Sequence, residues 1–115
     1  MRTPRDENWI TVPGLFSIQS SLQKKNGPAS VYVIGMVEQA EFVKVGIAAN
    51  VSYRLVELQT ASPFTLKILA SKRFNSKTEA RRTERDLHKQ FSDVRMSGEW
   101  FRLDASALNV LLESL

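Results

Sequence analysis

The stretch from Val31 to Ala49 reads VYVIGMVEQAEFVKVGIAA, and it decides the fold. Two runs rich in β-branched residues, each carrying a glycine, flank the short segment Val37-Glu38-Gln39-Ala40. This pattern predicts a β-hairpin, because β-branched side chains suit a pleated surface and the intervening residues suit a turn.

Side chains alternate between the two faces of a strand, and this alternation sorts the predicted hairpin. Tyr32 lies on the face opposite Val33, and Lys44 shares its face with Gly46. Lys44 is unusual because it places an ammonium group within an otherwise apolar strand. Either its stem lies along the surface with the charge in water, or the lysine has a function in a site.

The composition is that of a single globular domain. The chain has 115 residues, of which 43% are hydrophobic and 24% charged, and it contains no cysteine. Disulfides and thiolate-bound zinc are therefore excluded. The net charge of +4 permits a polyanionic partner without requiring one. No apolar run suits a signal peptide or a membrane span, so we expect a cytoplasmic protein without membrane contact.

Residues 1–28 are predicted to form an N-terminal extension, and residues 29–115 the folded domain. Proline and glycine interrupt the extension, and its apolar residues are scattered. A short amphipathic helix is expected at Leu15–Lys25. Trp9 and Phe16 would pack on the domain or contact a partner.

The segment after the hairpin predicts a helix over residues 50–60, capped by Asn50 or Ser52. Arg54 falls on the same face as the apolar stripe of this helix, so it should lie at the edge of the sheet. There it can hold an anion, or it is a rim arginine paired with a nearby carboxylate. Pro63 ends the helix, and residues 65–74 predict a third strand.

A second helix is predicted from Ser76 to about Phe91, opened by a capping box with Glu79. Glu84 falls within its apolar stripe, so it should be buried with a cation, a metal or a raised pKa. His88, one turn later, is either a structural histidine or a partner of Glu84 in a divalent-ion site. The opposite face is basic and suits either solvent or phosphates. It carries Lys77, Arg81, Arg82, Arg85 and Lys89.

The C-terminal part predicts a loop over residues 92–97, an extended segment over 98–103 and a final helix capped by Asp104. The leucines of that helix form a packing stripe. The expected fold class is therefore α/β, of the α+β kind, with a three-stranded antiparallel sheet flanked by helices.

Taken in order, these features resemble the GIY-YIG endonuclease superfamily over residues 30–103. Tyr32 matches the tyrosine of the first half-motif, and Lys44 stands where the second half-motif has its tyrosine. Arg54 matches the arginine of the following helix, and Glu84 matches the metal-binding glutamate. The combination of KVG, RLVELQTASP and GEWF is similar to a branch found in phages and prophages.

The resemblance implies a metal-dependent DNA endonuclease that hydrolyses phosphodiester bonds. Glu84 would bind one Mg²⁺ or Mn²⁺, and Arg54 would clamp the scissile phosphate. Glu99 would orient Arg54 or Lys44 through an ion pair. We expect the proton-abstracting group to be one of Tyr32, Lys44 and His88. The residues expected to bind DNA are Arg81, Arg82, Arg85 and Lys89.

DNA is the expected partner, and a homodimer or a second protein would supply specificity because the chain leaves little room for a sequence-reading module. A different function remains open, that of a catalytically inactive DNA-binding module of the same fold, such as a phage regulatory protein. A third possibility is a protein-interaction domain that uses Trp9. Phosphate-dominated binding would fall steeply as salt rises, whereas binding through Trp9 would not.

Overall fold

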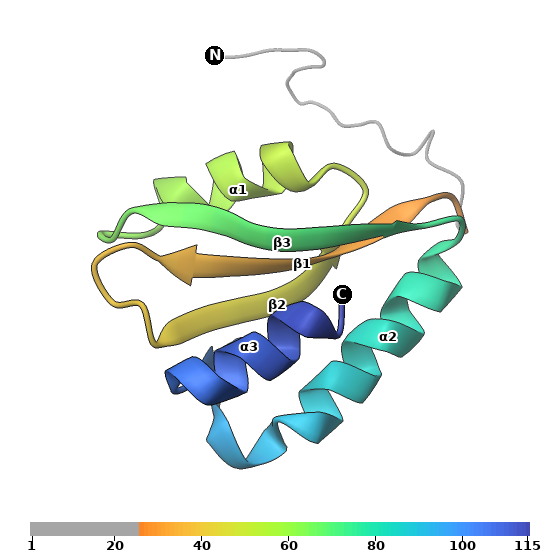
Figure 1. The fold of residues 1–115 in the computed structure, drawn as a ribbon. Coiled ribbons are helices and arrows are strands. Elements are labelled where there is room, and N and C mark those ends of the chain that lie inside the picture. Colours follow the sequence, from red (N-terminus) through yellow and green to blue (C-terminus); the bar gives the residue numbers. More distant parts are fainter. Residues whose placement is uncertain (1–25) are drawn as a thin grey trace.

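The computed structural model describes residues 26–115, which form a five-stranded antiparallel sheet with helices on both faces (Figure 1). The strand order across the sheet is β3-β1-β2-β5-β4. Along the chain the strands and helices are β1 (Ala29–Met36), β2 (Phe42–Ala48), α1 (Val51–Thr60), β3 (Leu66–Phe74), α2 (Lys77–Gln90), a 3₁₀ turn (Ser92–Val94), β4 (Arg95–Ser97), β5 (Trp100–Arg102) and α3 (Ala105–Glu113).

The predicted hairpin is confirmed as β1 and β2 at the centre of the sheet. Their register pairs Tyr32 with Gly46 and Ile34 with Lys44. The side chains alternate between faces as the period of two requires. The strands predicted over residues 31–36 and 65–74 are thus β1, which extends two residues further toward the N-terminus, and β3, which begins one residue later.

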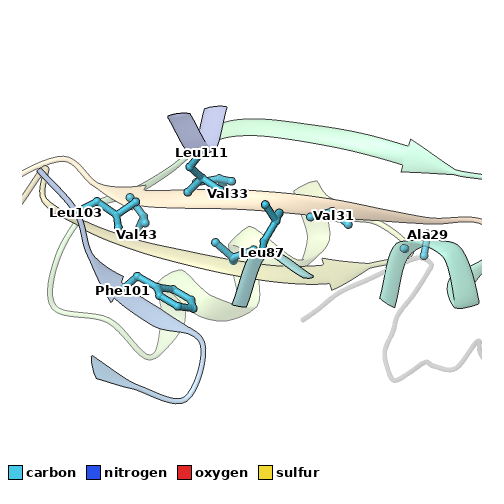
Figure 2. Packing of buried hydrophobic residues seen from close by; sticks show 10 residues of the cluster. Ala29, Val31, Val33, Val43, Leu87, Phe101, Leu103 and Leu111 are labelled. Atoms are coloured by element: carbon cyan, nitrogen blue, oxygen red, sulfur yellow. The ribbon is translucent and has the colours of Figure 1, made fainter. Parts of the chain in front are cut away.

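The sheet separates two apolar clusters. On one face Val31, Val33 and Val43 pack with Leu87 of α2 and Leu111 of α3 (Figure 2). On the other face Tyr32, Ile34 and Leu66 form a smaller cluster, against which α1 packs through its half-buried apolar residues. Helix α1 therefore covers one face and helices α2 and α3 cover the other (Figure 1). Burying each large apolar side chain contributes about 1.5–3 kcal/mol.

The three helices begin where capping residues predict. Asn50 Oδ1 accepts a hydrogen bond from Tyr53 N at 2.9 Å, so Asn50 and not Ser52 caps α1. Ser76 Oγ accepts from Glu79 N at 3.2 Å, and Asp104 Oδ1 accepts from Ala107 N at 2.8 Å. Each such cap satisfies a backbone donor and stabilises its helix by about 1 kcal/mol.

The prediction of a three-stranded sheet is wrong, because the described sheet has five strands. Strand β5 pairs with β2, and β4 pairs with β5. Each of these strands has three residues. An alternating pattern cannot be recognised over so short a length, and β4 lies where the sequence indicated a loop.

The helix predicted at Leu15–Lys25, with Trp9 and Phe16, lies outside the described residues. Within residues 26–115, none of the helices has both the length and the apolar character needed to cross a membrane.

Candidate functional site

The candidate site lies at the outer edge of β2, where its pairing with β5 ends. Lys44 is the last paired residue of β2, opposite Trp100, and Val45 N then donates to Glu99 O at 3.1 Å. Beyond this point α2 takes the place of the strand, because His88 Nε2 donates to the Val45 carbonyl at 2.9 Å. The turn before β5 and helix α2 thus meet at one point of β2.

Gly46 makes room for the ring of Tyr32, its cross-strand partner. A Cβ atom on Gly46 would lie 2.5 Å from the Tyr32 hydroxyl oxygen and 2.8 Å from Glu99 Oε1. Both distances are shorter than van der Waals contact allows. The phenol of Tyr32 and the carboxylate of Glu99 therefore converge above Gly46, which has no side chain to displace them.

Lys44 is buried and paired. Only 8% of the residue is exposed, and its Nζ lies 3.1 Å from Glu99 Oε1. The same Nζ lies 5.7 Å from the centroid of the Trp100 ring, which is within range of a cation–π interaction. The ion pair that was predicted between Glu99 and either Arg54 or Lys44 is present with Lys44. The interpretation of Lys44 as a lysine with its charge in water is wrong.

Arg54 extends from α1 to the Tyr32 side of the sheet. Burial raises the pKa of the Tyr32 phenol, its interaction with Arg54 opposes this, and the charges of Glu99 and Glu84 raise it further. The net shift is upward, so the phenol is neutral at pH 7. Arg54 NH1 also donates to Glu57 Oε1 at 3.2 Å. The Arg54 side chain is 40% exposed, so its guanidinium can accept a further anion.

Glu84 is buried in α2, as its place in the apolar stripe predicted. Burial raises the pKa of its carboxyl, and the charge of Glu99 and a hydrogen bond with Glu99 raise it further. His88 and Arg81 act in the opposite direction without reversing the shift. The sequence predicted that a buried Glu84 would have a cation beside it, a bound metal or a raised pKa. Of these three, the raised pKa is found.

Two adjacent carboxylates suit a hard divalent cation. Residues 26–115 contain no group of three or more histidine, aspartate or glutamate side chains placed to hold a metal ion. Mg²⁺ nevertheless commonly uses one or two carboxylates and completes its coordination with water and substrate phosphate. Glu84 and Glu99 supply two such carboxylates whose mutual repulsion a cation would relieve. The donor set therefore fits Mg²⁺ or Mn²⁺.

A basic hollow borders Glu84 along α2. It is lined by Arg81, Glu84, Arg85, His88, Lys89, Ser92 and Arg95. Arg81 also lines two further hollows that extend toward the start of α2, both of which include Lys77. Exposed cations thus follow the helix on the side next to Glu84.

Arg82 is not part of this hollow, although it belongs to the predicted basic stripe. Successive residues of an α-helix are separated by about 100°, so Arg82 projects roughly 160° away from Glu84. Arg81 and Arg85 project closer to Glu84, which agrees with their place in the hollow. Of the four residues expected to bind DNA, Arg81, Arg85 and Lys89 line the hollow and Arg82 does not.

The structure brings six of the predicted residues to one place at the edge of β2. They are Tyr32, Lys44, Arg54, Glu84, His88 and Glu99. Gly46, Trp100 and Arg95 were not predicted to have a role in the site. Gly46 could have been found from the hairpin register, since it stands opposite Tyr32. Arg95 and Trp100 carry no periodic signal because they lie in strands of three residues.

The described chain is thus an α+β domain with paired carboxylates, a buried lysine, a partly exposed arginine and a neutral phenol beside a basic hollow. Comparison with known families matches residues 29–115 to the T5orf172 domain. The chain therefore belongs to the T5orf172 domain family. This is a nuclease-like, DNA-binding family, and membership is compatible with a DNA-related function. Neither the curated proteins nor the solved structures contain a match.

This family assignment corrects the one suggested by the sequence motifs. The resemblance to the GIY-YIG superfamily rested on short fragments around Tyr32, Lys44, Arg54 and Glu84. The family that matches is a different one, and it spans the whole domain from residue 29 to residue 115. The assignment to the GIY-YIG superfamily, including its phage-type branch, is therefore wrong.

Proposed function

We propose that this protein is a metal-dependent DNA endonuclease whose active site is the cluster at the edge of β2. The observation that carries the proposal is the pair of carboxylates, Glu84 and Glu99, held beside Lys44 and Tyr32. Burying one carboxylate against another is unfavourable for folding, so such a pair is typical of a functional site. Membership of a nuclease-like family supports the same conclusion.

The cations of the site suit a phosphodiester. Arg54 is partly exposed and can present its planar fork to two phosphate oxygens. Lys44 is fixed by Glu99 and Trp100, so its charge is held in place before the substrate binds. Preorganised charges of this kind stabilise the negative charge that develops during hydrolysis.

Tyr32 and His88 divide the remaining roles. The raised pKa of Tyr32 keeps the phenol protonated, so at neutral pH it donates a hydrogen bond to water or to a phosphate oxygen. His88 donates through Nε2 to Val45, which leaves Nδ1 as the nitrogen that can accept a proton. His88 thus anchors α2 to the edge of β2 and can also receive a proton from the attacking water.

Glu84 and Glu99 would hold one Mg²⁺ or Mn²⁺. A divalent cation bound there supplies positive charge to the phosphate oxygens and lowers the pKa of coordinated water. The raised pKa of Glu84 in the metal-free protein implies that cation binding and proton release are linked.

The basic hollow gives the DNA a path to the site. Arg81, Arg85, Lys89 and Arg95 line it next to Glu84. Lysine and arginine contacts to phosphates provide affinity without sequence preference. We therefore expect α2 to lie along the DNA backbone on one side of the cleaved bond.

The test is incubation of the purified chain with supercoiled plasmid and with branched DNA, in Mg²⁺, in Mn²⁺ and in EDTA. Glu84→Gln and Glu84→Ala serve as matched variants, and thermal unfolding is measured to check that both remain folded. The expected result is nicking that requires the metal and is lost in both variants.

Two results would contradict the proposal. Cleavage at the same rate in wild type and in the Glu84 variants would show that the activity arises elsewhere. DNA binding without cleavage in any metal would indicate a catalytically inactive DNA-binding module.

A further inference from the structure

An apolar hollow lies on the same face of the sheet as Tyr32 and Lys44. It is lined by Met36, Gln39, Phe42, Phe64, Met96, Ser97 and Trp100. Met96 is 58% exposed and Phe64 is 36% exposed, and both lie in this one hollow, where they form part of a contiguous apolar surface. Apart from Trp100, which helps to hold Lys44 in place, the proposed cleavage chemistry does not use these residues.

The hollow is continuous with the candidate active site through Trp100. This residue pairs with Lys44 across β2 and β5, and its ring faces the Lys44 ammonium group. Phe42, which also lines the hollow, lies on the same face of β2 as Lys44 and two residues before it. Two strand residues span about 7 Å, which places the hollow close to one nucleotide step from the lysine.

We infer that this hollow receives an unpaired nucleobase adjacent to the phosphate held by Lys44 and Arg54. The inference rests on the proposed function and deepens it by naming the substrate class as DNA with unpaired nucleotides near the cleavage site. Aromatic and apolar side chains stack on bases of any identity, whereas phosphates are held by cations.

The arrangement of charge favours a base over an apolar protein segment. Lys44, which is buried and paired with Glu99, places a fixed cation beside Trp100, and a DNA strand offers a phosphate and a base at matching positions. Gln39 and Ser97 add polar groups to an otherwise apolar lining, and such groups can bond to the edge of a base. A paired base within a duplex cannot reach the hollow, because it must first leave the stack.

The binding experiment uses the fluorescence of Trp100 in EDTA, where no cleavage occurs. The chain has two tryptophans, so the experiment is made in a Trp9→Phe background. Three oligonucleotides of equal length are compared: a thymidine single strand, the same strand with abasic sites, and a duplex. We expect quenching by the thymidine strand, loss of quenching with the abasic strand, and binding of the duplex that is weaker by about tenfold.

The matched variant replaces both exposed residues of the hollow, as Phe64→Ala with Met96→Ala. The hydrogen bonds of Phe64 are made by its backbone, with Ser62 and Gln59, so the loop should keep its shape. Val110→Ala is the control, since Val110 is an exposed apolar residue of α3 on the other face. We expect the double variant to weaken single-strand binding by about tenfold and the control to leave it unchanged.

The outcomes separate this inference from the proposed function. Equal binding of the abasic and the thymidine strands would overturn the inference, while plasmid cleavage that depends on Glu84 would leave the function intact. Absence of binding to every oligonucleotide, together with absence of plasmid cleavage that depends on Glu84, would remove the proposed function itself. If the wild type self-associates and the double variant loses that association but keeps its DNA binding, the inference would also be overturned, since the hollow would then join two copies of the chain.

Discussion

The ring of Tyr32 lies over Gly46, with its hydroxyl oxygen only 2.5 Å from the position that a Cβ atom would occupy. The two residues are directly paired across β1 and β2. The absence of a side chain at position 46 therefore leaves the space that the phenol occupies in the site.

Gly46→Ala should displace the Tyr32 ring, destabilise the fold by about 1–3 kcal/mol and reduce cleavage. The unfolding free energy is measured for Gly46→Ala in the wild-type and in the Tyr32→Ala background. The loss caused by the added methyl group should be smaller in the second background, because the overlapping phenol atoms are gone and only Glu99 Oε1 still lies close to the methyl group. Equal losses in the two backgrounds would show that the ring is not the obstacle.

Glu84→Gln should stabilise the metal-free protein at neutral pH. Because the pKa of Glu84 is raised above 4.5, the folded state binds its proton more tightly than the unfolded state does. The stability that this provides is present at acidic pH and is lost as pH rises through the folded-state pKa. In EDTA we expect the variant to be more stable by about 1 kcal/mol at pH 7, a gain of a few degrees in Tm.

The comparison of Glu84→Gln with wild type should be repeated at acidic pH and with Mg²⁺. At acidic pH the difference should shrink, because the wild-type carboxyl is then protonated. Added Mg²⁺ should raise the Tm of wild type and not that of the variant. A difference in Tm that stays constant with pH would contradict the upward shift of the Glu84 pKa.

Lys44→Met should reduce cleavage far more than stability. Glu99 is 36% exposed and can be hydrated when its partner is removed, so the stability should change by no more than about 1 kcal/mol. Loss of a fixed cation at the phosphate should lower the cleavage rate by about 10²–10³-fold. Lys72→Met, on exposed β3, is the control. Undiminished cleavage by Lys44→Met would remove this lysine from the mechanism.

The Tyr32 phenol should titrate above pH 10 in the folded protein, because its pKa is raised from 10.0. The chain has two tyrosines, so Tyr53→Phe leaves Tyr32 as the single phenol. The ultraviolet absorbance of phenolate, followed against pH, reports the titration. Since protonation favours the folded state, Tyr32 should also weaken stability as its phenolate forms. A phenolate that appeared below pH 10 would contradict this account.

Arg81→Ala and Arg85→Ala should each weaken DNA binding and reduce the dependence of log K on log salt concentration by about one unit. Arg82→Ala is the matched control on the same helix, since Arg82 projects away from the hollow. Fluorescence anisotropy of a labelled duplex, measured over a series of salt concentrations, compares the three. An equal effect of all three substitutions would indicate that DNA contacts the helix without regard to the hollow.

The longer elements of the fold could be predicted from the sequence. The hairpin strands have eight and seven residues, which is enough for the alternation of side chains to be recognised. Asn50, Ser76 and Asp104 marked the helix starts because their side chains replace missing backbone partners. Strands β4 and β5 were not predicted as sheet strands, since pairing over three residues depends on tertiary contacts that the sequence does not reveal.

The candidate site could be predicted where a charged residue occupies a position in an apolar pattern. Lys44 in an apolar strand and Glu84 in an apolar stripe are such residues, and both are buried. The role of Gly46 depends on the register of the hairpin, and that of Trp100 on the pairing of β5 with β2. The separation of Arg82 from Arg81 and Arg85 depends on the position of α2 against the sheet.

The hydrogen bonds of Val45 have a consequence for the solubility of the protein. Its N–H is bound by Glu99 and its carbonyl by His88, so β2 presents no free backbone group there to another chain. An uncovered strand edge is a template for β-sheet aggregation. The histidine at the candidate site therefore also covers this part of the β2 edge, and its loss would leave the Val45 carbonyl free to pair with another strand.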